Sequence, residues 1–198
     1  MVNINKPQKV GAVVILLIIL VIFVRLVGSE INYVKSTLDN NDYLVRNLPD
    51  NQQAANMLAQ IKQNIHSLIT YLNEHQEQFK EYREYTTQLN ERIKNVVISE
   101  SSDDNQYTSY SVNKGEEIVF CLRSRADKNK FHGLNLIMYV ALHELAHVAC
   151  PEFGHTTLFK KIFSFLTTIG INIGIYHKID FDAHPTEYCG LIIADSIV

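Results

Sequence analysis

Apolar residues recur at three- and four-residue intervals along three stretches of the chain, the spacing that places side chains on one face of a helix. The first stretch extends from Leu58 to Ile93, and the second, Leu134–Ala149, is apolar on most sides, as in a buried helix. The third runs from Leu158 to Ile169 and would pack against the second. The pattern therefore predicts three helical regions.

A hairpin is predicted between the first two helical regions. Thr108–Val112 alternates in polarity, and Glu117–Arg123 is rich in β-branched and apolar residues. Asn113-Lys114-Gly115, between them, is typical of a turn. Together with the helices, this hairpin predicts an α+β fold.

The long helical region, residues 50–97, begins after Pro49 and has two interpretations. Its heptad spacing suits a coiled coil that dimerises the protein, or one or two helices that pack on the rest of the chain. The seam contains His75 and Thr86, and its flanks lack sustained pairs of opposite charge. We therefore favour helices packed on the core, and the oligomeric state stays open.

The N-terminal region contains a mainly apolar segment, residues 10–27, that is interrupted by Arg25 and approaches the length needed to span a bilayer. Lys6 and Lys9 precede it. By the positive-inside rule we predict a single-pass membrane anchor, with residues 1–9 in the cytosol and the C-terminal domain on the far side.

The segment after this anchor, residues 28–49, would be a linker or a juxtamembrane helix. The alternative to an anchor is a secretory signal peptide, cleaved at the small residues near Val27-Gly28-Ser29. In that case the mature protein would be secreted.

The second helical region carries the sequence His143-Glu144-Leu145-Ala146-His147, the HExxH pattern of zinc peptidases. Residues four apart on a helix lie one above the other, so both histidines can reach one Zn²⁺ ion. Glu144 beside them is the candidate general base. Buried histidines that merely pack in a core are the alternative.

A catalytic zinc needs a third protein ligand and an open position. Pro151 ends the helix, and Gly154 allows the chain to turn back and present His155 to the metal. By spacing alone, four other residues remain alternatives to this histidine: Cys150, Glu152, Asp180 and Glu187.

Several segments together resemble the WLM and SprT-like zincin metallopeptidases, and most of all the predicted WLM-type peptidases of large DNA viruses and some protists. They are Val112–Arg123, Leu142–His147, Gly154-His155 with Phe159, and the closing segment Asp180–Gly190. The likeness covers the chain from about residue 95 to the C-terminus.

This resemblance implies a zincin-like core over residues 98–198, with His143, His147 and His155 on zinc and Glu144 as general base. One departure is Thr156, because typical WLM members have aspartate after the third histidine. The missing carboxylate leaves the partner of that histidine open. An edge strand beside the metal would hold an extended protein or peptide substrate by main-chain pairing.

Two tyrosines near the end of the chain are candidates to stabilise the oxyanion, Tyr188 first and Tyr176 second. Three cysteines, at positions 121, 150 and 189, allow one disulfide or none.

The charge pattern bears on possible partners. The net charge is −3 and no basic tail follows the core, which disfavours nucleic acid as a partner. A basic cluster does occur, formed by Arg123, Arg125, Lys128 and Lys130. Because some relatives of the SprT and WLM type act on DNA-crosslinked proteins, a DNA-protein crosslink protease is one alternative function.

The sequence favours a membrane-anchored zinc metallopeptidase. A non-catalytic membrane or virion protein with a vestigial zinc site is the other alternative. An intact Glu144 argues against that alternative, since a structural site has no need of a glutamate beside its first ligand.

Overall fold

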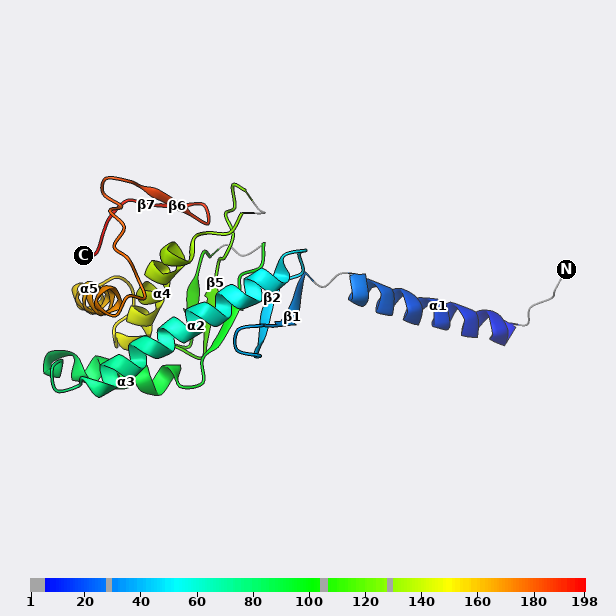
Figure 1. Cartoon of the computed structure of the whole chain (residues 1–198). Coiled ribbons are helices and arrows are strands. Elements are labelled where there is room, and N and C mark those ends of the chain that lie inside the picture. Colours follow the sequence, from blue (N-terminus) through cyan, green and yellow to red (C-terminus); the bar gives the residue numbers. More distant parts are fainter. Residues whose placement is uncertain (1–5, 28–29, 104–106, 128–129) are drawn as a thin grey trace.

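The computed structural model describes residues 6–27, 30–103, 107–127 and 130–198, which form a mixed assembly of helices and strands (Figure 1). This confirms the predicted α+β class. The elements are α1 (Lys6–Val27), β1 (Ile31–Lys35), β2 (Asp42–Arg46), α2 (Asn51–Glu74), the short 3₁₀ helix η1 (Lys80–Tyr82), α3 (Arg83–Ile93), β3 (Val97–Glu100), β4 (Tyr110–Val112), β5 (Glu117–Phe120), α4 (Leu134–Ala149), α5 (Thr157–Asn172), β6 (Thr186–Tyr188) and β7 (Leu191–Ile193).

A five-stranded sheet has the strand order β1-β2-β3-β5-β4. The pairs β1/β2 and β4/β5 are antiparallel, and β2/β3 and β3/β5 are parallel. The β4/β5 pair is the hairpin predicted from the sequence. Strand β4 is therefore an edge strand, with one side free of any strand of this sheet. Strands β6 and β7 form a separate two-stranded sheet.

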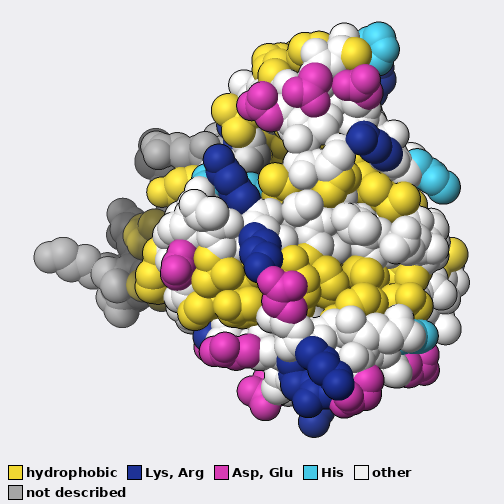
Figure 2. All heavy atoms as spheres, turned by 90° about the vertical axis from the view of Figure 1, so that its left-hand side faces the viewer, with side chains coloured by type: hydrophobic (Ala, Val, Ile, Leu, Met, Phe, Trp, Pro, Cys, Tyr) yellow, Lys and Arg dark blue, Asp and Glu magenta, His cyan; other side chains and the backbone are white. Residues whose placement is uncertain are grey.

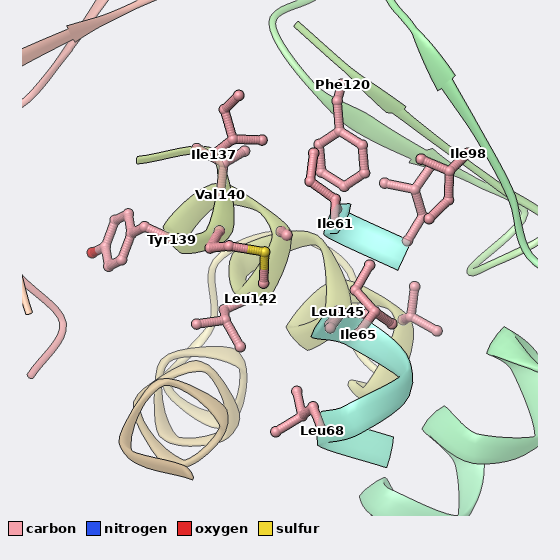
Figure 3. Close-up of a cluster of buried hydrophobic side chains, with 14 of the residues drawn as sticks. Ile61, Ile65, Leu68, Ile98, Phe120, Ile137, Tyr139, Val140, Leu142 and Leu145 are labelled. Atoms are coloured by element: carbon pink, nitrogen blue, oxygen red, sulfur yellow. The ribbon is translucent and has the colours of Figure 1, made fainter. Parts of the chain in front are cut away.

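The hydrophobic core lies between the sheet and the helices α2 and α4 (Figure 3). Ile61 and Ile65 of α2 are buried against Ile98 and Phe120 of the sheet and Leu145 of α4. The spacing of the two isoleucines on one helix face is the spacing that predicted this helix. The core thus fixes α4, the helix with the HExxH sequence, on the sheet.

Helix α5 packs against the opposite side of α4. A Cβ atom added at Gly170 would lie 3.1 Å from Leu142 Cδ1, so a glycine at this position permits the close approach of the two helices. Helices α2 and α3 fold back on each other and on α4, so the heptad-spaced region forms two packed helices joined by a short 3₁₀ turn.

The structure differs from the expectation for residues 28–49, which form neither a linker nor a juxtamembrane helix in their described part. Residues 31–46 instead contain the antiparallel pair β1/β2. Tyr43 and Val45, two positions apart, are buried against α2 while Asp42 is exposed, and this alternation is that of a strand with one covered face. The sheet therefore extends beyond the expected core of residues 98–198.

The predicted membrane anchor is also corrected. In the part of the chain that the structure describes, no helix combines the length and apolarity needed to cross a bilayer. The reason is visible in the sequence, since the uninterrupted apolar run covers only residues 10–24. At about 1.5 Å per residue it spans about 22 Å, against a hydrocarbon core of about 30 Å. The prediction of a single-pass protein with a cytosolic N-terminus was therefore wrong. The alternative cleavage position at Gly28-Ser29 lies outside the described residues.

Candidate metal centre and catalytic cleft

Helix α4 presents both histidines of the HExxH sequence to the same point. The Nε2 atoms of His143 and His147 lie 3.1 Å apart, as the helical spacing predicts. The face of α4 that carries them borders a cleft, whereas most of the remaining helix is buried. The apolar residues around the motif therefore anchor the helix, and the two imidazoles are left partly accessible.

The loop after α4 returns a third imidazole. Gly154 has a φ of +78°, a conformation that glycine adopts readily, and His155 follows it. Lys114, in the turn between β4 and β5, donates hydrogen bonds to the carbonyl oxygens of residues 150–152, at 2.6, 3.2 and 3.1 Å respectively. The hairpin turn thus holds the segment that leads to His155.

The three imidazoles converge. His155 Nε2 lies 3.0 Å from His143 Nε2 and 3.2 Å from His147 Nε2. A neutral imidazole has one N–H, so three Nε2 atoms in a triangle cannot all be satisfied by each other. Burial lowers the pKa of His143 to about 3 and that of His147 to about 4, which keeps both neutral at pH 7. Neutral imidazole nitrogens are the form that binds metals.

Within the described ranges, these three histidines form the one cluster of histidine, cysteine or carboxylate groups that could hold a metal ion. The four residues that the sequence left as alternative third metal ligands lie outside this cluster. Cys150 is a buried thiol at the end of α4, and Glu187 accepts hydrogen bonds from Ser124 and from the Gly190 N–H. Glu152 borders the cleft but does not join the cluster, and Asp180 caps a turn at Ala183.

Phenylalanines of α5 support the imidazoles. Phe159 stacks on His147 with 4.2 Å between ring centroids, and Phe163 meets His143 edge-on at 5.1 Å. Thr156 accepts a hydrogen bond from the Phe159 N–H at 3.2 Å and so caps the N-terminus of α5. Thr156 therefore caps the helix that carries the aromatic support.

Glu144 lies beside the histidines and is 6% exposed. Burial raises its pKa to about 7, and hydrogen bonds from the side chain and backbone of Ser111 limit the rise. Ser111 belongs to β4, so the edge strand contacts the glutamate directly. The arrangement provides a carboxyl group that can take up and release a proton near neutral pH.

The two candidate tyrosines have different positions. Tyr188 borders the cleft, and its hydroxyl lies 2.6 Å from Ser109 Oγ, which also accepts the Cys121 N–H at 3.0 Å. Burial raises the pKa of Tyr188, so its hydroxyl stays protonated. Tyr176 is buried away from the cleft, and its hydroxyl accepts the Ile179 N–H at 3.0 Å.

Cys121 and Cys189 form a disulfide, a pairing that the sequence left open. The bond joins the end of β5 to the turn that follows Tyr188. It therefore ties the β6–β7 hairpin to the main sheet. His132 lies against this bond, with its Nε2 3.3 Å from the Cys189 nitrogen, which donates to it.

A cleft of 1330 Å³ is lined by the three histidines, Glu144 and Tyr188. One wall is formed by residues 108–114 of β4 and its flanks, and the floor is α4 with its two histidines and Glu144. The opposite wall is formed by Tyr188 and residues 191–195. The volume exceeds the roughly 300–1,000 Å³ of a site for a small molecule, so the cleft has room for a peptide.

Two members of the basic cluster noted in the sequence are held by contacts within the protein. Arg123 is buried and forms ion pairs with Glu100 at 2.8 Å and Asp50 at 2.6 Å. Arg125 donates to the Tyr107 carbonyl, and Lys128 lies outside the described residues. Lys130 is exposed.

Comparison with known proteins identifies the family. The model of the WLM domain matches residues 37–168, which is most of the chain. A protein of Acanthamoeba polyphaga mimivirus, called uncharacterized protein R325, is 48% identical over 188 residues, covering 94% of this chain and 95% of the relative. The chain therefore belongs to the WLM domain family, and it has relatives in large DNA viruses. Membership of this family supports a zincin-like protease.

Two further proteins show the extent of the likeness. Uncharacterized protein 136R of Invertebrate iridescent virus 6 is 36% identical over 72 residues, covering 35% of this chain and 39% of the relative. The crystal structure of Wss1 from Saccharomyces cerevisiae aligns with a TM-score of 0.44 and 21% identity, covering 66% of this chain and 88% of that one.

Proposed function

We propose that this protein is a zinc-dependent peptidase that hydrolyses peptide bonds in protein or peptide substrates. One observation carries the proposal, namely the convergence of three imidazole Nε2 atoms beside a buried glutamate in a peptide-sized cleft. Membership of the WLM family supports it.

The three histidines fit zinc. Two nitrogens about 2.0–2.1 Å from one tetrahedral ion lie roughly 3.3 Å apart, close to the 3.0–3.2 Å between the Nε2 atoms of His143, His147 and His155. Three protein ligands leave one position open, the pattern of catalytic zinc. Zinc held there would lower the pKa of a bound water and polarise a substrate carbonyl.

Glu144 is assigned the role of general base and then general acid. Its carboxylate takes the proton of the attacking water and delivers it to the leaving amine. Burial of the Glu144 side chain between α4 and β4, together with the hydrogen bonds from Ser111, fixes its carboxyl group beside the cleft. A pKa of about 7 suits a group that performs both transfers.

Tyr188 is assigned as a hydrogen-bond donor to the oxyanion. Tyr188 borders the cleft, and its hydroxyl stays protonated and is oriented by Ser109. A donor placed in advance where negative charge develops stabilises the transition state more than the ground state. The edge strand β4 is assigned to the substrate, which would lie along it as an additional strand.

Two measurements on the purified full-length chain test the proposal. Metal analysis should find about one zinc ion per chain in the wild type and in Glu144→Gln, since the glutamate is not a ligand. Cleavage of a peptide library should fall by about 10²–10⁴-fold in Glu144→Gln. Glu152→Gln is the matched control, because it makes the same change at an exposed residue of the same cleft. Bound zinc with cleavage that is independent of Glu144 would refute the proposal.

A further inference from the structure

The wall of the cleft opposite β4 is also a strand. Residues 191–195 border the cleft, and the first three of them are strand β7. Because β6 and β7 form a two-stranded sheet of their own, β7 has one side that pairs with β6 and one side that does not. The cleft therefore runs between two strands, each with an unpaired edge.

The turn of the β6–β7 hairpin determines which backbone groups of β7 are free. Cys189 and Gly190 form a two-residue loop, and both have positive φ, +51° and +86°, as in a type I′ turn. Such a loop closes on a hydrogen-bonded pair, here Tyr188 and Leu191, and the pairs then alternate. The next residue, Ile192, is thus in a non-hydrogen-bonded pair, and its N–H and C=O point away from β6.

The unpaired edge of β4 can be located in the same way. The Ser111 N–H donates to the Glu144 carboxylate, so it points away from β5 and toward the site. Ser111 pairs with Ile118 across the hairpin, and backbone groups two residues apart on a strand point to the same side. The N–H and C=O of one strand residue point to the same side, so the Ser111 C=O also lies on the cleft side of β4.

Large apolar side chains are exposed at the rim of the cleft. Leu191 and Ile192 are 58% and 65% exposed, and Phe153, in the loop that leads to His155, is 84% exposed. Hydrophobic side chains are visible both on the upper part of the molecule and on the body below it in Figure 2. A group of exposed apolar residues beside a cleft is typical of a binding surface.

We propose that β7 is a second substrate strand, so that an extended polypeptide segment with apolar side chains lies between β4 and β7. The inference rests on the peptidase function proposed above and specifies its substrate class. Two unpaired strand edges facing one cleft are complementary to one extended chain, which has hydrogen-bonding groups on both sides. A compact folded surface lacks such a strand, so the substrate is a flexible or locally unfolded apolar segment.

Binding without cleavage tests this assignment. The probe is a fluorescein-labelled peptide of about ten residues that is rich in leucine, valine and phenylalanine, and fluorescence anisotropy is measured with zinc-loaded Glu144→Gln. Ile192→Asp in this background should weaken binding at least about tenfold, since it places a charge at an apolar contact. Leu38→Asp is the matched control, because Leu38 is similarly exposed, 58% against 65% for Ile192, but lies in the β1–β2 turn. It should leave the affinity unchanged.

A second variant tests whether the backbone N–H of Ile192 contributes to peptide binding. Ile192→Pro removes the N–H that points away from β6 and leaves the hydrogen-bonded pairs of the hairpin in place. This variant should weaken binding of the same peptide, while its circular dichroism spectrum and melting temperature stay close to those of the parent. A photoreactive phenylalanine analogue in the peptide should crosslink to residues 191–195.

The outcomes separate this inference from the peptidase proposal. Equal peptide affinity in the parent and both Ile192 variants, or crosslinks confined to other segments, would overturn the role of β7. Failure of the parent to prefer the apolar peptide over one with serine at the apolar positions would do the same. Normal binding with the predicted loss in the Ile192 variants, but no zinc-dependent cleavage by the wild type, would refute the peptidase proposal alone.

Discussion

Two halves of the cleft are built in different ways. The histidine half consists of His143, His147 and His155, whose contacts join residues only 4, 8 and 12 positions apart in the chain. The tyrosine half consists of Tyr188 on β6 and its partner Ser109, which are 79 positions apart. The imidazoles of the histidine half come from a single helix and the loop after it, whereas the tyrosine half depends on a contact between distant segments.

This difference between the two halves accounts for the position of the disulfide bond. Helical geometry alone aligns His143 with His147, and the hydrogen bonds of Lys114 hold the short return loop. The β6–β7 hairpin pairs with no strand of the main sheet, and the Cys121–Cys189 disulfide ties it there. We therefore expect changes in the histidine half to remove the metal, and changes in the tyrosine half to alter rate or stability with the metal retained.

The largest effect is expected from His155→Ala. Loss of one of three ligands should reduce the zinc content of the dialysed protein to near zero. Peptide cleavage should fall by at least about 10³-fold, because the metal contributes several kcal/mol of transition-state stabilisation. Zinc is measured by elemental analysis. His66→Ala, at an exposed histidine of α2, is the control and should change neither quantity. A variant that keeps zinc at the wild-type affinity would show that His155 is not a ligand.

Glu144 follows His143 on α4 and accepts hydrogen bonds from Ser111 of β4. The pH dependence of stability of the metal-free protein should report on the burial of this carboxyl group. Its folded pKa of about 7 lies above the ordinary value of 4.5. The protonated form is thus favoured by folding, and its contribution is complete below about pH 4.5 and lost as the pH rises through about 7. Between these limits, the unfolding free energy of the wild type should fall by about 3 kcal/mol relative to Glu144→Gln, at about 1.4 kcal/mol per pKa unit.

Urea unfolding in the presence of a chelator, at pH values from about 4.5 to 8, measures this difference. His143 and His147 act in the opposite direction, because their lowered pKa values give stability that is present above about pH 6.5 and lost on acidification. Both proteins contain these histidines, so their effect largely cancels. A difference that stays constant across the pH range would contradict the buried environment of Glu144.

The histidine half was predictable from the sequence because its determinants are local. Helical periodicity, the i and i+4 histidines, the helix stop at Pro151 and the turn at Gly154 together indicate where His155 can lie. The position of β4 at the sheet edge was only partly predictable. Its hairpin has a sequence signal, but its place in the strand order depends on β3 and on contacts that the local pattern does not contain.

The tyrosine half could not be derived from local patterns. Three cysteines allow three pairings, and Cys121–Cys189 is selected by a fold that brings the end of β5 to the β6–β7 turn. The β1–β2 pair was missed because its strands are short and only Tyr43 and Val45 carry the buried face. The anchor was predicted from the length of an apolar segment, residues 10–27, that includes Arg25, and no described helix combines the length and apolarity needed to cross a bilayer.

Removal of the disulfide should affect the tyrosine half alone. The double variant Cys121→Ser, Cys189→Ser releases a loop whose ends are 68 residues apart, and we expect a loss of about 2–4 kcal/mol in unfolding free energy. Zinc content should stay at the wild-type value. The free thiol variant Cys150→Ala is the comparison, and its loss should be smaller because it removes no crosslink. Loss of zinc together with the disulfide would show that the two halves depend on each other.

The smallest effect, and the most specific, is expected from Tyr188→Phe. Loss of a hydroxyl that stabilises the oxyanion should lower kcat by about 100-fold while KM and zinc content change little, because the interaction develops only in the transition state. Tyr139→Phe is the matched control, since it removes another hydroxyl of the same cleft, one that contacts the Asp195 carbonyl at 3.3 Å. Ser109→Ala should have an intermediate effect, because the hydroxyl of Tyr188 remains but loses its orienting partner. An unchanged kcat in Tyr188→Phe, with a lower melting temperature, would show that this tyrosine contributes to packing and not to catalysis. Catalysis would then depend on the histidine half and Glu144.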